Sequence, residues 1–187
     1  MSFEMIENEL DGANIKVVGI GGAGGNAINH MIDSGVQGVE FIAINTDKQA
    51  LKRTLASKSV QLGDQGLGAG ARPDAGRSAA EAERERIREM LDGSNMVFLT
   101  AGMGKGTGTG ASPVVAEVAK ELGILTVGVA TKPFEFEGKK KMQIADGGID
   151  SLVELVDSLI VVLNQNLFAV MDEDASLEDA FKRADDV

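Results

Sequence analysis

Residues 96–122 read MVFLTAGMGKGTGTGASPVVAEVAKEL. The apolar run at the start of this stretch is typical of a buried strand, which we expect over residues 96–101. A loop follows in which glycine occupies every second position from 102 to 110. Beyond the loop, apolar residues recur at helical spacing, so we expect a helix that Ser112 caps and that carries Pro113 in its first turn. The stretch predicts a strand, a bare glycine loop and a helix in succession.

The same succession occurs near the N-terminus. Residues 15–20, IKVVGI, predict another buried strand, and residues 21–25, GGAGG, lead into an apolar stripe at helical spacing. Residues 19–24 fit the pattern GxGxxG between a strand and a helix. Taken alone, this pattern leaves two interpretations open. Backbone N–H groups at a helix N-terminus could hold a phosphate there, or the glycines could simply form a tight turn.

Strands and helices alternate along the rest of the chain. Further strands are expected over residues 39–45, 60–62, 125–131 and 158–163, and helices over residues 78–91, 141–155, 166–171 and 176–187. This alternation predicts an α/β fold, a three-layer doubly wound parallel sheet of Rossmann-like type. Ligands of such sheets bind outside the carboxyl ends of the strands, and both glycine loops fall there.

The helix expected over residues 78–91 carries charged side chains at helical spacing. Three Glu–Arg pairs, each three residues apart, are expected to interact on its solvated face: Glu81/Arg84, Glu83/Arg86 and Glu85/Arg88. We interpret this face as solvated surface rather than as a functional charge patch.

Composition excludes several classes of function. The chain has 187 residues, enough for one well-packed domain, with no cysteine, one histidine and a formal net charge of −11. Disulfides, a thiolate nucleophile and a Cys-ligated metal are therefore excluded, and the charge argues against a nucleic-acid surface. Neither a signal peptide nor an apolar run of the roughly 20 residues that span a membrane is present, so we expect a cytoplasmic protein. An acidic protein that binds phosphates needs backbone donors, which draws attention to the 24 glycines.

A resemblance to a known family rests on several of these stretches. Residues 104–110, GKGTGTG, resemble the signature loop GGGTGTG of the tubulin/FtsZ family of cell-division GTPases. The likeness extends from residue 14 to the end of the chain, through IKVVGIGGAGGNAINHMI, GVEFIAINTD, GLGAGARPDAGR, TKPFEFEGKKKM and DAFKRADDV. It implies a Rossmann-like GTPase domain that binds GTP or GDP.

The resemblance also implies which residues bind the nucleotide. The diphosphate and base would contact the first loop: Gly21, Gly22, Ala23, Gly24, Gly25 and Asn26. Residues that close over the phosphates would be Asn45, Gly70 and Ala71. The second loop would hold the phosphate tail from the other side: Gly104, Lys105, Gly106, Thr107 and Gly108. Thr131, Glu137 and Lys141 would approach the ribose and phosphates.

The base pocket can also be argued physically. Phe181 and Asp185 are four residues apart on the last expected helix and so share a face. The ring can stack on a purine, and the carboxylate can accept hydrogen bonds from N1–H and the 2-amino group of guanine. Adenine offers neither donor, so this pair predicts GTP over ATP. The alternatives are that Phe181 belongs to the core and that Asp185 is a surface acid.

The chain departs from the family pattern at four positions. Lys105 replaces the middle glycine of the signature loop, which would cost about 1–2 kcal/mol if the backbone there needed a positive φ. Its ammonium could instead approach the terminal phosphate as a point charge. Lys141 stands for the usual Arg, Arg72 for the usual Asn and Leu163 for Pro. The change at 105 calls normal turnover into question.

The family's domain organisation implies what surrounds the site. We expect a flexible segment over residues 1–13, the GTP-binding domain over residues 14–175, and the start of a central helix over residues 176–187, with the second domain absent. Hydrolysis would need an acidic loop from the next subunit of a head-to-tail protofilament, so no catalytic residue is expected within this chain. Mg²⁺ would be held by phosphates and water, with no metal-ligating side chains. The family implies division-ring adaptor proteins as partners, contact with the membrane only through adaptors, and a location at the mid-cell ring.

Two other functions remain open from the residues alone. A Rossmann oxidoreductase would place the first loop on NAD and Asp47 on its ribose, but it leaves the second glycine loop unexplained. A non-catalytic interaction module would bind no nucleotide.

Overall fold

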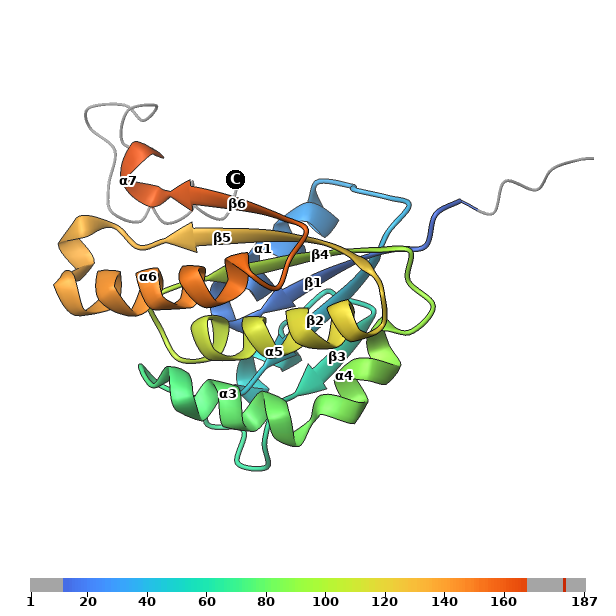
Figure 1. Cartoon of the computed structure of the whole chain (residues 1–187), viewed down its shortest axis with the longest axis horizontal. Coiled ribbons are helices and arrows are strands. Elements are labelled where there is room, and N and C mark those ends of the chain that lie inside the picture. The colour runs from blue at the N-terminus through green and yellow to red at the C-terminus, as the bar shows by residue number, and fades with distance from the viewer. Residues whose placement is uncertain (1–11, 168–179, 181–187) are drawn as a thin grey trace, which may run out of the picture.

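The computed structural model describes residues 12–167 and Ala180, and its centre is a six-stranded parallel sheet (Figure 1). The strand order is β3-β2-β1-β4-β5-β6, with all five pairings parallel. The strands are β1 (Ile15–Ile20), β2 (Glu40–Asn45), β3 (Lys58–Gln61), β4 (Met96–Gly102), β5 (Leu125–Lys132) and β6 (Ser158–Leu163). The direction of winding reverses between β1 and β4, and the carboxyl ends of strands at such a point form a crevice.

Helices cover both faces of the sheet, as predicted. They are α1 (Gly21–Asp33), α2 (Lys48–Lys52), α3 (Pro73–Ala82), α4 (Arg84–Leu91), α5 (Thr107–Glu121), the 3₁₀ turn η1 (Glu135–Glu137), α6 (Lys139–Val153) and α7 (Asn164–Leu167). Apolar side chains of α1 and α2 pack with one face of β1 and β2. The larger core, on the opposite face, is formed with α3, α4, α5 and α6. The α/β doubly wound prediction is therefore confirmed. Within the described residues no helix is both long and apolar enough to cross a membrane.

The start of α5 differs from the prediction. Capping rules placed it at Ser112, but the helix begins at Thr107 and contains Pro113. The Ser112 hydroxyl donates to the Gly108 carbonyl at 2.7 Å, inside the helix. The cause is packing against α3, because a Cβ at Gly110 would lie 2.0 Å from the Pro73 carbonyl oxygen. Glycine, an intrinsic helix breaker, is here the residue that lets two helices touch backbone to backbone.

Other boundaries also moved. The single helix expected over residues 78–91 is two helices. The first, α3, begins earlier, at Pro73, and Glu83 separates it from α4 with a non-helical φ of −105° and ψ of 16°. The short elements α2 and η1 were not predicted. Elements of five and three residues are too short to show a helical period in their apolar residues. Of the helix expected over residues 166–171, α7 covers the beginning, and residues 168–171 lie outside the described part.

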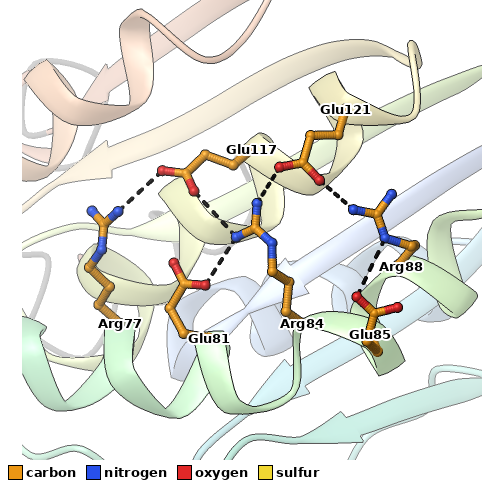
Figure 2. Close-up of polar contacts among 7 residues, drawn as sticks. All are labelled: Arg77, Glu81, Arg84, Glu85, Arg88, Glu117 and Glu121. Atoms are coloured by element: carbon orange, nitrogen blue, oxygen red, sulfur yellow. Dashed lines mark hydrogen bonds and ion pairs between the residues drawn. The ribbon is translucent and has the colours of Figure 1, made fainter.

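Charged side chains join α3 and α4 to α5 (Figure 2). The network consists of Arg77, Glu81, Arg84, Glu85, Arg88, Glu117 and Glu121. Arg84, whose side chain is 23% exposed, lies 3.0 Å from Glu81 and also reaches Glu117 at 3.3 Å and Glu121 at 2.5 Å on α5. Hydrogen bonds from Arg84, then from Arg88, lower the pKa of Glu121. Of the three expected pairs, Glu81/Arg84, which joins α3 to α4, and Glu85/Arg88 occur, whereas no ion pair joins Glu83 to Arg86 among the described residues. Most of the contacts bridge to α5.

A buried lysine lies at the amino end of the sheet. Lys16 in β1 is 4% exposed, and its ammonium donates to the carbonyls of Met90 at 2.7 Å and Asp92 at 3.0 Å. The carboxylate of Glu40 lies 3.7 Å from Lys16 and 2.7 Å from Lys58. The hydrogen bond from Lys58 is the largest influence on the pKa of Glu40, and with both lysine charges it outweighs burial and lowers that pKa below its ordinary 4.5.

The lowered pKa of Glu40 predicts that this carboxylate stabilises the fold at neutral pH but not in acid, and that Glu40→Gln removes this pH-dependent part of the stability. A carboxylate with a depressed pKa in the folded state stabilises the protein above its unfolded-state pKa, and this contribution is lost as the pH falls through the folded value. We expect Glu40→Gln to lower the melting temperature at pH 7, with the difference from the unmodified chain shrinking below about pH 4.5. Thermal unfolding across pH 3–7 measures this, with Glu85→Gln, a side chain 83% exposed, as the matched control. A deficit independent of pH would contradict the prediction.

Candidate nucleotide site

The two glycine loops meet where the winding of the sheet reverses. One follows β1 and the other follows β4, which are neighbours in the sheet. A Cβ at Gly21 would lie 2.9 Å from the Gly108 backbone nitrogen, and one at Gly108 would lie 2.4 Å from the Gly102 carbonyl oxygen. Gly21 also has a φ of +75°, which disfavours any side chain. Two turns 87 residues apart in sequence, at 21 and 108, thus pack backbone against backbone.

Each loop winds directly into the first turn of a helix. Gly21 begins α1 and Thr107 begins α5, and neither first turn contains an acidic residue. Within the described residues, the N–H groups of Thr107, Gly108 and Thr109 donate to no backbone carbonyl, because the first bond of α5 runs from Gly110 to Gly106. Free amides and the positive ends of two helix dipoles favour an anion at this point.

A cavity of about 720 Å³ opens above this junction. That volume lies in the range of small-molecule sites, roughly 300–1,000 Å³. Most of the residues expected to bind nucleotide line it: Gly21, Gly22, Ala23, Gly25, Asn26, Asn45, Gly70, Lys105, Gly106, Thr107, Gly108, Thr131, Glu137 and Lys141. The cavity therefore brings both loops together with the ends of β2 and β5.

Three of the remaining expected site residues, Gly24, Gly104 and Ala71, do not line the cavity. Gly24 is buried against the sheet, where a Cβ would meet the Thr100 carbonyl oxygen at 2.4 Å, so its smallness serves helix–strand packing. The amide of Gly104 donates to the Thr109 hydroxyl oxygen at 3.0 Å instead of facing the cavity. Ala71 is exposed beside the cavity but does not line it. Phe181 and Asp185 lie outside the described residues, so the base-recognition pair stays a prediction.

Short polar contacts hold the cavity walls together. The buried hydroxyl oxygens of Thr46 and Thr107 are 2.6 Å apart and join the end of β2 to the start of α5. The Gly106 amide donates to the Gly70 carbonyl at 2.9 Å, which fixes the loop before α3 against the second glycine loop. The Thr107 hydroxyl is therefore engaged in the fold, and its backbone amide is the group left for a ligand.

Both cavity-lining carboxylates within the described residues have partners. Asp47 caps α2, where its Oδ1 accepts from the amides of Gln49 at 2.7 Å and Ala50 at 3.3 Å. Glu137 accepts from the Lys141 ammonium at 2.9 Å and from the Phe134 amide at 3.1 Å. Glu137 and Lys141, both expected near the ribose and phosphates, thus form an ion pair in the cavity wall.

Lys105 is exposed and carries no backbone strain. No non-glycine residue among those described has a positive φ, so the 1–2 kcal/mol cost considered for a positive φ at this position does not arise. The unusual conformation falls instead on Gly104, with a φ of +101°. Lysine in place of the family's glycine is accommodated by the loop.

Some of the residues that line the cavity belong to no motif recognised in the sequence. The wall around α2 was not predicted as a binding surface, and it includes Asn29, Ala50, Leu51, Arg53 and Thr54. Asn164, which follows β6, also lines the cavity, and its buried Oδ1 has no hydrogen-bond partner among the described residues. The usable signal was position, since polar residues directly after β2 and β6 lie at the same sheet edge as the glycine loops.

Comparison with known proteins gives the chain its relatives. A family model described as "Tubulin/FtsZ family, GTPase domain" matches residues 14–172. The chain is 59% identical over 188 residues to cell division protein FtsZ of Pseudomonas putida, covering 99% of this chain and 47% of that protein. It is 59% identical to FtsZ of Coxiella burnetii, covering 99% and 49%. Among solved structures it resembles an empty FtsZ dimer from M. jannaschii, with a TM-score of 0.91 and 45% identity over 95% of this chain and 52% of that chain. The chain spans about half the length of the curated relatives it matches.

Proposed function

Because this chain belongs to the Tubulin/FtsZ family, we propose that its cavity binds GTP and GDP and that it is the nucleotide-binding half of a filament-forming cell-division GTPase. The observation that supports this most is the backbone contact between Gly21 and Gly108, which aims the N-termini of α1 and α5 at one cavity. Two sets of amides around one anion suit a chain of phosphates better than they suit a single carboxylate.

The cavity has chemistry for each part of the nucleotide. The phosphates would lie on the first turns of α1 and α5, where free amides face an anion. The Oδ1 of Asn164, which has no partner among the described residues, supports a base or ribose elsewhere in the cavity, because a buried acceptor needs a donor and both groups offer one. Phe181 and Asp185 are proposed to stack on guanine and to accept its N1–H and amino hydrogens. Mg²⁺ is proposed to be held through phosphates and water.

Hydrolysis is proposed to need a second subunit. Phosphoryl transfer requires a group that orients the attacking water, in addition to positioning of the phosphates. Of the cavity-lining carboxylates that the structure describes, Asp47 caps a helix and Glu137 binds Lys141. We propose that an acidic loop of a neighbouring subunit, in a head-to-tail protofilament, supplies the missing group. A cytoplasmic division ring, with adaptor proteins linking it to the membrane, completes the proposal.

The proposal predicts a guanine-selective, weakly catalytic chain. A fluorescent GTP analogue is expected to bind and to be displaced by GTP and GDP, but not by ATP or NAD. With Mg²⁺ and GTP, the purified chain is expected to release phosphate at close to the rate without protein. Displacement by NAD would favour an oxidoreductase, and absence of binding would favour an interaction module. Steady phosphate release in proportion to protein concentration would contradict the need for a second subunit.

A further inference from the structure

Lys105 is a long cation in a loop otherwise built from glycine and threonine. It lies between Gly104 and Gly106, is exposed and lines the cavity. The backbone amides of Thr107, Gly108 and Thr109, which donate to no backbone carbonyl among the described residues, follow it directly in the first turn of α5. The side chain therefore stands beside the positive end of a helix, where a cation gains nothing from the helix dipole.

Among the described residues, the ammonium of Lys105 has no acidic partner. Within the described part of the chain, no hydrogen bond or ion pair joins its Nζ to another residue. The cavity's carboxylates are engaged, Asp47 with the amides of α2 and Glu137 with Lys141. Lys141, by contrast, is neutralised by its own neighbour at 2.9 Å. The Lys105 charge thus adds to the partial positive charge of the free amides at the start of α5, and a bound anion would interact favourably with both.

We propose that Lys105 binds the terminal phosphate of GTP and makes the chain prefer GTP to GDP. This inference rests on the proposed function. A flexible stem and three donors let the ammonium act as a point charge on a phosphate. GDP lacks that phosphate, so this ion pair forms with GTP alone and the side chain discriminates between the two nucleotides. The same positive charge takes over part of the neutralisation that Mg²⁺ provides, so the preference persists in the absence of divalent cations.

Competition binding in EDTA tests this inference. The ratio of the GDP and GTP dissociation constants is measured by displacement of a fluorescent GDP analogue from the unmodified chain and from Lys105→Met, Lys105→Gly and Lys105→Arg. We expect the unmodified chain to bind GTP about tenfold more tightly than GDP, and the Met and Gly variants to bring the ratio near one. Lys105→Arg should keep the preference, because it keeps the charge. Raising the salt concentration should reduce the ratio in the unmodified chain and leave it unchanged in Lys105→Met.

Lys120→Met is the matched control. Lys120 is exposed at the far end of α5 and does not line the cavity, so its replacement should leave the ratio unchanged. The inference is overturned if the unmodified chain and Lys105→Met bind both nucleotides with the same ratio. If no protein binds either nucleotide, the proposed function falls and this inference with it. Loss of GTP preference in the control as well as in Lys105→Met would show that the side chain at 105 is not the cause.

Discussion

Gly22→Leu is expected to abolish nucleotide binding while leaving the fold intact. Gly22 lines the cavity, and a Cβ built there meets no atom within 4 Å, so the protein itself has room for a larger side chain. That room is where the phosphates are proposed to lie. We expect GTP and GDP affinities to fall at least about 100-fold. The melting temperature should hold or rise, because leucine favours a helix over glycine by roughly 1 kcal/mol.

The comparison with Gly147→Leu separates a blocked site from general damage. Gly147 in α6 also has open space around its Cβ, but it does not line the cavity. Both variants add the same side chain to a helix, so a binding loss confined to Gly22→Leu identifies the cavity as the site. Undiminished GTP binding by Gly22→Leu would refute the proposed position of the phosphates.

Gly110→Ala is expected to produce the largest loss of stability. A Cβ at Gly110 would lie 2.0 Å from the Pro73 carbonyl oxygen and 2.7 Å from the Arg77 backbone nitrogen. Neither backbone atom can move without shifting α3 away from α5. Forced overpacking of this kind costs about 3 kcal/mol, which corresponds to a fall in melting temperature on the order of 10 °C.

Nucleotide binding should weaken together with this loss. The loop before α3 holds Gly70, whose carbonyl accepts the Gly106 amide, so a displaced α3 disturbs the second glycine loop. Chemical denaturation measures the change in unfolding free energy, with Gly147→Ala as a control that should be neutral or slightly stabilising. A melting temperature within about 2 °C of the unmodified chain would contradict the backbone contact.

The parallel strands could be read from the sequence with little error. Residues 15–20 and 158–163 were predicted with the bounds that the structure shows. β1 is a central strand, covered on both faces, so it appears as a short continuous run of branched apolar residues. β6 has the same kind of sequence but lies at the edge of the sheet, where Ile160, Val161 and Leu163 are exposed. The six strands and the reversal of winding then place any loop after β1 and β4 at one crevice.

Helix starts within glycine-rich sequence could not be predicted in the same way. Local propensity treats the glycines from 106 to 110 as a loop, yet α5 begins among them because α3 packs on that turn. Gly24 shows the same limit within the site. The family resemblance implied that Gly24 contacts the nucleotide, and the structure shows that its missing side chain permits close packing on Thr100. A glycine's position in a motif does not tell whether its missing side chain makes room for a ligand or for a neighbouring strand.

The site residues that belong to no motif could not be predicted from the sequence for a different reason. Asn164 follows β6, whereas the wall at α2 combines Asn29 of α1 with residues in and after α2, and only the folded chain brings them to one cavity. Lys105 shows the converse. Its identity was visible in the sequence, whereas its negative φ and the absence of an acidic partner among the described residues are seen only in the folded chain.

A crystal structure of the chain grown with a non-hydrolysable GTP analogue tests the central claim most directly. The predicted result places the phosphates between the first turns of α1 and α5, with amides of both turns within hydrogen-bond distance of the same phosphate chain. Phosphates bound by one turn alone, or a nucleotide bound outside the cavity, would contradict the account.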